Sequence, residues 1–342
     1  MKNTSLSDIA RKLGVSTTLV SLVLNGKSKE SRINKEMAQK VLKTASEMNY
    51  KPNQLARGLR TGKTHTLALI VADISNIFFA RLARVIEDEA GKFGYKVMFG
   101  SSDENPEELD EMLNIFQERK VDGFIISPTI GSAKFITELK KKNIPFVLID
   151  RYFPKIKSNY VIVDNYNASY RATSHLLKFG YKRIGTLTIS PELSQMRDRM
   201  SGFKQALRDE GIRFENKFVG DIEYNDLRES VFENVKKLLS PPLNARALYF
   251  QNYILGVAGL ECIKEMKLRV PLDVAVVCFD DPIEFRLFET PITAIKQPVE
   301  EIGEQAVRIL LDELNGSSTG ERNVVLPTQF HVRRSCGNLD FL

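Results

Sequence analysis

The stretch at residues 5–26 reads SLSDIARKLGVSTTLVSLVLNG, and its pattern predicts two short helices joined by a tight turn. In the first helix, over 6–13, the apolar residues share one face and Ser5 is placed to cap the amino end. A second helix is predicted over 17–24 and ends at Asn25-Gly26. Two short helices joined by such a turn form the centre of a helix-turn-helix unit.

A third helix completes this unit. Asn34 is placed to cap it, because a short polar side chain at that position can accept from the first free backbone N–H groups. Its apolar residues recur at helical spacing, at Met37, Val41, Ala45 and Met48. We therefore expect residues 1–50 to form one small helical domain.

Residues 51–63 read KPNQLARGLRTGK and are expected to form a linker. Pro52 can begin a helix but cannot continue one. Gly58 disfavours a helix by roughly 1 kcal/mol relative to alanine. The helical part would be only about two turns long, and helices this short are marginal in water. We expect a linker helix that is ordered only when a partner holds it.

The charge of the chain is concentrated at the amino end. Residues 1–63 contain 13 Lys and Arg against 4 Asp and Glu, a net charge of +9, whereas the other 279 of the 342 residues carry −3. A small basic module on a mildly acidic body indicates a polyanionic partner, nucleic acid first. Charge alone leaves open the alternative of a lysine-rich surface that is merely solvated.

From His65 onward the pattern changes to that of an α/β protein. Short apolar runs typical of strands occur at 67–72, 97–99, 124–127, 146–149, 161–163, 184–189, 247–250 and 274–279. Helical periodicity lies between most of them, for example at 79–93, 106–119, 169–179 and 199–210. This alternation is typical of parallel sheets, and eight strands in about 215 residues suit two sheets better than one.

Cysteine content and the amino terminus indicate the compartment. The chain has three cysteines, which are far apart and form no CxxC pair, so neither a disulfide framework nor a cysteine metal site is expected. The first residues lack the apolar stretch of a signal peptide. The most apolar run, 67–72, stops at Asp73 and is too short to cross a membrane. We expect a cytoplasmic protein without a membrane partner.

No enzyme signature is found in the sequence. A GxGxxG after a strand, a P-loop, HExxH and GxSxG are all missing, and the three histidines have no nucleophile or metal partner nearby in sequence. His175 lies among leucines in a predicted helix, where a structural histidine is the default. We expect no catalytic residue, no metal and no cofactor. A stand-alone binding protein is the other alternative, but it has no use for a basic helix-turn-helix module.

Ordered motifs along the chain resemble the lactose-repressor (LacI/GalR) family of bacterial transcription regulators. They are Leu6-Ser7-Asp8-Ile9-Ala10, Gly14-Val15-Ser16-Thr17-Thr18, Asn49-Tyr50-Lys51-Pro52-Asn53, Asp73-Ile74-Ser75-Asn76-Ile77-Phe78-Phe79, Phe279-Asp280-Asp281 and Val332-Arg333-Arg334-Ser335-Cys336. Each is weak alone, but together they are specific. The resemblance extends over nearly the whole chain.

The resemblance implies three parts: a helix-turn-helix DNA-binding headpiece at 1–50, a hinge helix at 51–63, and a periplasmic-binding-protein-like core at 64–342. In this family the core consists of two doubly wound parallel-sheet subdomains that share the carboxyl-terminal segment. We expect subdomain 1 at about 64–160 and 293–323, and subdomain 2 at about 161–292 and 324–342.

The resemblance also implies which residues contact DNA. Ser16, Thr17, Thr18 and Leu22 match positions at the start of the second helix that meet the major groove. Leu59 matches a leucine that enters the minor groove as a wedge. Lys51, Arg57, Arg60 and Lys63 would contact phosphates. The other DNA-contacting positions by this resemblance are Ser21, Asn25, Asn34, Tyr50, Asn53, Leu55 and Ala56.

For the core, the resemblance implies a small effector in the cleft between subdomains, with a sugar or sugar derivative as the default. Polar residues that follow predicted strands suit this role, because ligands of open α/β sheets bind beyond the carboxyl ends of strands. The candidates are Asp73, Asn76, Phe79, Ser127, Asp150, Arg151, Arg199, Gln251, Asn252 and Asp280.

The expected function is therefore that of an effector-controlled repressor that binds a pseudo-palindromic operator as a homodimer. The alternatives are a stand-alone sugar-binding protein and a sugar-acting enzyme of the same core fold. Without the resemblance, the favoured interpretations are a strand-end turn for Asp280 and a solvated residue at a helix start for Arg199.

Overall fold

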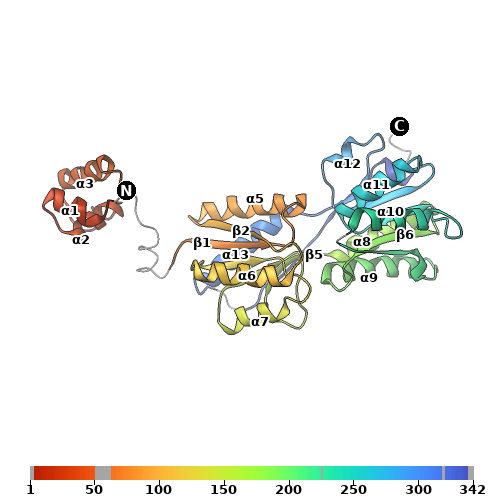
Figure 1. The fold of residues 1–342 in the computed structure, drawn as a ribbon, viewed down its shortest axis with the longest axis horizontal. Coiled ribbons are helices and arrows are strands. Elements are labelled where there is room, and N and C mark those ends of the chain that lie inside the picture. The colour runs from red at the N-terminus through yellow and green to blue at the C-terminus, as the bar shows by residue number, and fades with distance from the viewer. Residues whose placement is uncertain (1–3, 51–62, 225, 318–319, 338–342) are drawn as a thin grey trace. The chain divides into compact units, whose positions relative to one another are not determined.

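The computed structural model describes residues 4–50, 63–224, 226–317 and 320–337, which form two units: one up to Thr64 and one from His65. The linker expected at 51–63 lies almost entirely outside the described residues. The elements of the two units are shown in Figure 1, and each unit is described here by itself.

The headpiece contains the three predicted helices, α1 (Leu6–Leu13), α2 (Thr17–Leu24) and α3 (Lys35–Glu47). The side chain of Ser5 accepts from the backbone N–H of Asp8, and the carboxylate of Asp8 accepts from the backbone N–H of Ser5, at 3.3 and 2.9 Å. This reciprocal cap begins α1 as predicted. Gly14 ends it with φ of 67°, a left-handed conformation that glycine adopts without strain.

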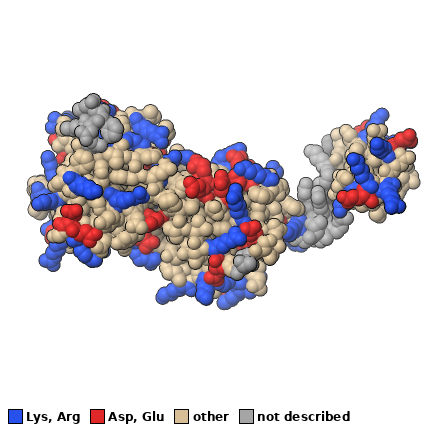
Figure 2. Space-filling view, turned by 180° about the vertical axis from the view of Figure 1, so that it is seen from behind, with Lys and Arg blue, Asp and Glu red and all other residues tan. Residues whose placement is uncertain are grey.

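A small apolar core holds the headpiece together. Its fully enclosed members are Ile9, Ala10, Val20, Val23, Val41 and Ala45. Lys and Arg side chains are spread over the headpiece surface in Figure 2, where they cover more of it than Asp and Glu do. The basic excess found in the sequence is therefore solvent-facing charge on a compact three-helix domain.

Two six-stranded sheets form the core. The first has the order β11-β5-β4-β3-β1-β2 and is parallel throughout. Its strands are β1 (Thr66–Val71), β2 (Lys96–Ser101), β3 (Gly123–Ile126), β4 (Phe146–Ile149), β5 (Asn159–Val163) and β11 (Asn323–Leu326). Helices cover both faces: α5 (Ile77–Lys92) and α13 (Val299–Leu314) on one, α6 (Pro106–Glu118) and α7 (Ala133–Lys141) on the other.

The second sheet has the order β12-β10-β9-β8-β6-β7, with only the β10–β12 pair antiparallel. Its strands are β6 (Ile184–Ile189), β7 (Val219–Ile222), β8 (Ala247–Phe250), β9 (Ala275–Phe279), β10 (Thr293–Lys296) and β12 (Gln329–His331). On one face lie α8 (Asn165–Lys178) and α9 (Ser194–Asp209), and on the other lie α10 (Leu227–Leu239) and α11 (Tyr253–Glu265). Shorter elements are α12 (Glu284–Leu287) and the 3₁₀ turns η1 (Asn216–Phe218) and η2 (Arg334–Cys336).

The eight predicted strand regions are all present as strands, and both sheets are doubly wound as expected. The expected subdomain boundaries need correction. Strand β5, which reaches Val163, lies wholly in the first sheet, whereas β10, at 293–296, lies in the second. The first subdomain also extends to Leu326, because β11 pairs with β5. Each boundary therefore falls after the complete strand, since a strand cannot be shared between two sheets.

Helix α9 begins earlier than predicted, at Ser194 rather than near Arg199. It packs closely against α8, and Gly202 makes this approach possible. A Cβ at Gly202 would lie 2.2 Å from the carbonyl oxygen of Tyr166 and 2.9 Å from the backbone nitrogen of Tyr170. Both neighbours are backbone atoms of α8, so they cannot move aside as a flexible side chain would.

Replacing Gly202 by alanine is predicted to destabilise the core, because the methyl group forces α8 and α9 apart. The expected loss is about 2 kcal/mol in the free energy of unfolding, after the small gain in helix propensity. Urea denaturation followed by circular dichroism measures it. Ser201→Ala is the matched control, since Ser201 is the exposed neighbour in the same helix. Equal stability of the two variants would contradict the proposed close approach.

Candidate functional site: the headpiece surface and the interdomain cleft

The amino end of α2 presents polar side chains to solvent. Ser16 caps the helix, with its hydroxyl accepting from the backbone N–H of Leu19 at 3.2 Å. Thr17 and Thr18 follow it in the first turn and are exposed. Val20 and Val23 point the other way, into the headpiece core. The first turn of α2 is therefore open to a ligand, and its free backbone N–H groups suit a phosphate.

The other headpiece candidates also have structural contacts. Asn25 donates to the carbonyl of Ser21 at 2.7 Å and to its hydroxyl at 3.3 Å, which ends α2. Asn34 caps α3 by accepting from the backbone N–H of Glu36 at 2.9 Å, as predicted. Tyr50 packs against the headpiece core, and burial raises the pKa of its phenol. Leu22 is half-buried.

Four of the predicted DNA contacts lie outside the described residues, namely Asn53, Leu55, Ala56 and Leu59. The same holds for Lys51, Arg57 and Arg60, whereas Lys63 is described. Their roles stay predictions.

In the core, a cleft lies where the carboxyl ends of strands from both sheets meet. It encloses a cavity of about 60 Å³. Eight of the ten residues predicted for effector binding line it: Asp73, Asn76, Phe79, Asp150, Arg151, Arg199, Asn252 and Asp280. The other two, Ser127 and Gln251, are fully buried and are not among its lining residues. The structure thus brings together most of a set chosen from strand ends and from the family resemblance.

Local backbone geometry aims these side chains at the cleft. Asp150 follows β4 and Asp280 follows β9, and both have left-handed φ angles, of 66° and 74°. This turn ends the strand and redirects the chain immediately after the last sheet residue. Asn76 and Asn252 cap α5 and α11, with their side-chain oxygens accepting from backbone N–H groups. The lining is therefore built on strand ends and helix starts, which are rigid supports.

Arg199 projects from α9 and is only 2% exposed. It donates to the side chain of Asn165 at 2.8 Å and to the carbonyl oxygen of Gln251 at 2.6 Å. Its guanidinium carbon lies 3.4 Å from the centroid of the Phe279 ring. Gln251 therefore acts on the cleft through its backbone, whereas its side chain donates to Thr186.

Burial dominates the ionisation of Arg199 and Asp280. It lowers the pKa of Arg199, and the nearby charges of Asp280 and Asp150 oppose this shift only in part. It raises the pKa of Asp280, against the opposing effects of Arg199 and of hydrogen bonds from Gln297 and from the backbone of Tyr253. Both members of this coupled pair are less favourably ionised than they would be in water.

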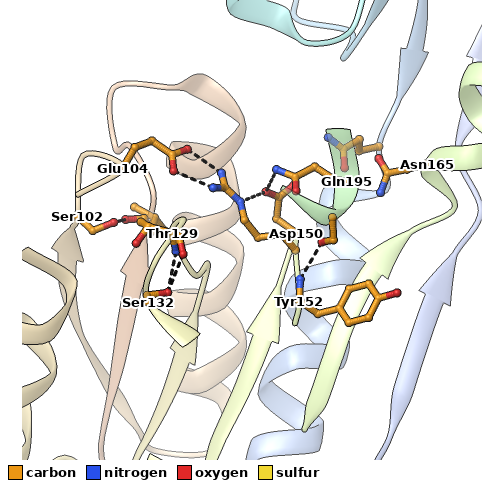
Figure 3. A network of polar contacts seen from close by, with 12 residues as sticks. Ser102, Glu104, Thr129, Ser132, Asp150, Tyr152, Asn165 and Gln195 are labelled. Carbon is orange, nitrogen blue, oxygen red and sulfur yellow. Dashed lines mark hydrogen bonds and ion pairs between the residues drawn. The ribbon is translucent and has the colours of Figure 1, made fainter. Parts of the chain in front are cut away.

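Arg151 is held very differently. Its two terminal nitrogens each donate to one oxygen of Glu104, both at 2.8 Å, and its Nε donates to Asp150 at 3.1 Å. Burial disfavours its charge, but the two carboxylates outweigh burial, so the pKa of Arg151 is raised. In Figure 3, Glu104 and Asp150 point toward the same guanidinium group from opposite sides.

Several hydrogen bonds join the two subdomains across the cleft. The phenol of Tyr224 donates to Asp73 at 3.1 Å. The pKa of Tyr224 is raised, mainly by burial and next by the charge of Asp73. The backbone N–H of Tyr152 donates to the hydroxyl of Ser194 at 3.1 Å. Gln195 donates to Asp150 at 3.4 Å.

The cleft is also lined by Glu104, Ser190, Gln195 and Tyr224, which were not expected from the sequence. Glu104 and Tyr224 follow β2 and β7, so the rule that ligands bind beyond strand ends applies to both. Tyr224 could not be identified by this rule, because β7 was not predicted from the sequence.

Within the described residues, no group of three or more His, Cys, Asp or Glu side chains could hold a metal ion. No helix of the described chain is both long and apolar enough to cross a membrane. His175 packs edge-on against the rings of Phe179 and Phe330. Burial lowers the pKa of its imidazole, which agrees with the structural role expected for it.

Comparisons with known proteins agree with this architecture. Sequence models of two families match the chain: bacterial regulatory proteins of the lacI family at residues 5–53 and a periplasmic binding protein-like domain at residues 173–336. The HTH-type transcriptional regulator DegA of Bacillus subtilis (strain 168) is 29% identical over 98% of this chain and 99% of its own. Catabolite control protein A of Priestia megaterium is 30% identical over 97% of this chain and 99% of its own.

Solved structures extend the comparison. The structure of the transcriptional regulator CelR in complex with cellobiose matches this chain with a TM-score of 0.72 and 25% sequence identity. The match covers 97% of this chain and 100% of the CelR chain. The lac repressor dimer bound to operator and the anti-inducer ONPF has a TM-score of 0.86 at 22% identity, over 98% and 99% of the two chains, and so shares the fold.

These relatives are transcription regulators and not enzymes, and the expected family is confirmed. With a helix-turn-helix headpiece and a core of two doubly wound sheets, the chain belongs to the lacI family of bacterial regulatory proteins.

Proposed function

We propose that the protein is a cytoplasmic, homodimeric repressor whose affinity for a pseudo-palindromic operator is set by a sugar or sugar derivative bound in the cleft. The observation that carries this proposal is the lining of the cleft. Three aspartates, Asp73, Asp150 and Asp280, share it with Arg199 and the ring of Phe79. Carboxylates and guanidinium groups bind hydroxyls by hydrogen bonds, and an aromatic face covers the apolar side of a sugar ring.

The headpiece would contact DNA in three ways. Thr17 and Thr18 at the exposed amino end of α2, together with the half-buried Leu22, meet base edges in the major groove, and Ser16 caps the helix so that its free N–H groups face a phosphate. Backbone contacts come from Ser21, Asn25, Asn34 and Tyr50. The linker residues Asn53, Leu55, Ala56 and Leu59 occupy the minor groove, where Leu59 acts as the wedge.

A sugar is favoured by the chemistry of the cleft lining and by similar proteins whose structures contain a sugar. The CelR structure, whose chain is 25% identical to this one, contains cellobiose. Other relatives, such as the repressors PurR of Photobacterium profundum and CytR of Escherichia coli K12, have names that do not specify a sugar. The proposal that the ligand is a sugar therefore rests mainly on the residues that line the cleft.

The size of the cavity suggests how the ligand acts. At about 60 Å³ it is far smaller than the roughly 300–1,000 Å³ of typical ligand pockets. A sugar must therefore widen the cleft and replace bonds such as Tyr224–Asp73 that join the subdomains. Because such a ligand prefers one cleft opening over another, it can shift the equilibrium between two core states.

We predict that one of a panel of sugars raises the melting temperature of the full-length protein and changes its affinity for the operator upstream of its own gene. Asp73→Asn and Arg199→Ala should each weaken binding of that sugar by about 10-fold or more, the cost of a lost charged hydrogen bond. Isothermal titration calorimetry measures sugar affinity, and a gel shift measures operator affinity.

Arg197→Ala is the matched control for Arg199→Ala, because Arg197 lies in the same helix and is exposed. Circular dichroism checks that each variant is folded. Asp73 is half-exposed, so Asp73→Asn still tests the site if Arg199→Ala does not fold. Binding that is unaffected in Asp73→Asn and in folded Arg199→Ala would place the sugar elsewhere. Turnover of a sugar without DNA binding would overturn the proposed function as a whole.

We also predict that Leu59→Ala weakens binding to the operator by a few kcal/mol, while binding to unrelated DNA stays nearly the same. The reason is that a wedge contributes only when the operator bends around it. Titrations of operator and of scrambled DNA at one salt concentration compare the two affinities. An equal loss on both DNAs would show that Leu59 is not a wedge.

A further inference from the structure

The charged groups of the cleft are unequal in number. Asp73, Glu104, Asp150 and Asp280 contribute four carboxyl groups, against the two guanidinium groups of Arg151 and Arg199. The lining drawn from the described residues contains no lysine or histidine. A ligand that enters this cleft therefore meets more carboxyl groups than guanidinium groups.

Arg151, the cation nearest the carboxyl end of β4, already donates three of its five N–H groups to carboxylates. Glu104 accepts from both of its terminal nitrogens in a two-pronged pair, and Asp150 accepts from its Nε. Arg151 is 4% exposed, so the pair is shielded from water. An anionic group would have to displace Glu104 to reach this guanidinium group, and it would then lie against an expelled carboxylate.

The loop that carries Glu104 is fixed in an unusual backbone conformation. Asp103 and Glu104 both have positive φ angles, 47° and 59°, which cost energy for residues other than glycine. The backbone N–H of Glu104 donates to the carbonyl of Ala72 at 3.0 Å, and the hydroxyl of Ser101 donates to Asp103 at 2.5 Å. The loop is thus tied to β1 and β2 so that Glu104 reaches Arg151.

Arg199 does not offer a free anion site either. Two of its nitrogens donate to Asn165 and Gln251, and one face of its guanidinium group is covered by Phe279. Its charge is also adjacent to those of Asp280 and Asp150. The N–H groups of Arg199 that do not donate to Asn165 or Gln251 can still donate to a ligand. A neutral oxygen suits them better than a phosphate does, because the phosphate would be surrounded by carboxylates.

We propose that the cleft selects its effector by charge: it binds a sugar that donates hydrogen bonds through hydroxyl or amino groups, and it rejects the phosphorylated form of that sugar. Glu104 is the residue that sets this selectivity, because it occupies the guanidinium group that a phosphate would need. The inference rests on the proposed function for the statement that the ligand is a sugar. The exclusion of phosphate from Arg151 rests on the geometry alone.

The first test compares each sugar with its phosphate ester on the full-length protein, by calorimetry, using glucose with glucose 6-phosphate and ribose with ribose 5-phosphate. Any sugar that binds should bind about 100-fold more tightly than its ester, the size expected for two unfavourable charge contacts in a partly buried site. An ester that binds as tightly as the parent sugar, or more tightly, would overturn the proposal.

The second test uses inorganic phosphate as the probe and needs no sugar. Glu104→Gln keeps the shape of the side chain but removes its charge, so Arg151 becomes available. Phosphate should bind this variant about 10-fold more tightly than it binds the wild-type protein. The measurement is the phosphate-dependent rise in melting temperature, compared with sodium chloride at equal ionic strength.

Two further variants locate the effect. Glu261→Gln is the matched control, since Glu261 forms a similar two-pronged pair with Arg228 on the exposed surface of α10 and α11. It should respond to phosphate as the wild type does. In the double variant Glu104→Gln/Arg151→Gln the gain should disappear, because the phosphate has lost its partner.

The outcomes separate the two proposals. If no sugar binds but Glu104→Gln gains phosphate binding through Arg151, the charge selection stands and the sugar proposal fails. If phosphate stabilises wild type and Glu104→Gln equally, Glu104 does not exclude anions and the charge selection fails. If Glu104→Gln does not fold, the comparison of sugars with their esters on the wild-type protein decides the proposal.

Discussion

The chain crosses between the two sheets of the core three times, and this connectivity constrains the rest of the structure. The crossings follow β5, β10 and β11, so neither sheet is completed by one continuous stretch of chain. The subdomains can move relative to each other only by bending at these segments. One of them contains Gln297, which donates to Asp280 at 2.7 Å, so the crossing strands and the lining of the cleft are in direct contact.

The same connectivity explains why the polar residues gather where they do. Both sheets point the carboxyl ends of their central strands at the cleft, and those strands are buried on both faces. Charged side chains of the cleft therefore follow the last strand residue, as Asp150 and Asp280 do. Carboxyl groups from two sheets then face each other in a confined space, and Arg151 and Arg199 balance part of their charge.

The central strands could be predicted from sequence because short, nearly continuous apolar runs mark a strand with both faces covered. The strands that were missed lie at or near sheet edges. In β7 Gly220 and Asp221 interrupt the apolar pattern, and in β11 the side chains alternate between exposed and half-buried, so its short run Val324-Val325-Leu326 is not that of a buried strand. Eight cleft residues followed from the strand-end rule together with the family resemblance, on which Arg199 in particular depends because it lies within α9. The pairing of Glu104 with Arg151 joins positions 47 residues apart, which no local pattern encodes.

The two buried arginines bear on the proposal that the cleft binds a neutral ligand. Arg151 has more than enough negative charge around it, and its pKa is raised, whereas the pKa of Arg199 is lowered because burial outweighs Asp280 and Asp150. Asp280 is likewise unfavourably ionised through burial. A hydroxyl group can accept a hydrogen bond from Arg199 and donate one to Asp280, and so it relieves both groups at once. An anion relieves only Arg199 and makes the burial of Asp280 worse. The electrostatic state of these two residues supports the proposal of a neutral, hydroxylated ligand, in addition to the pairing of Arg151 with Glu104.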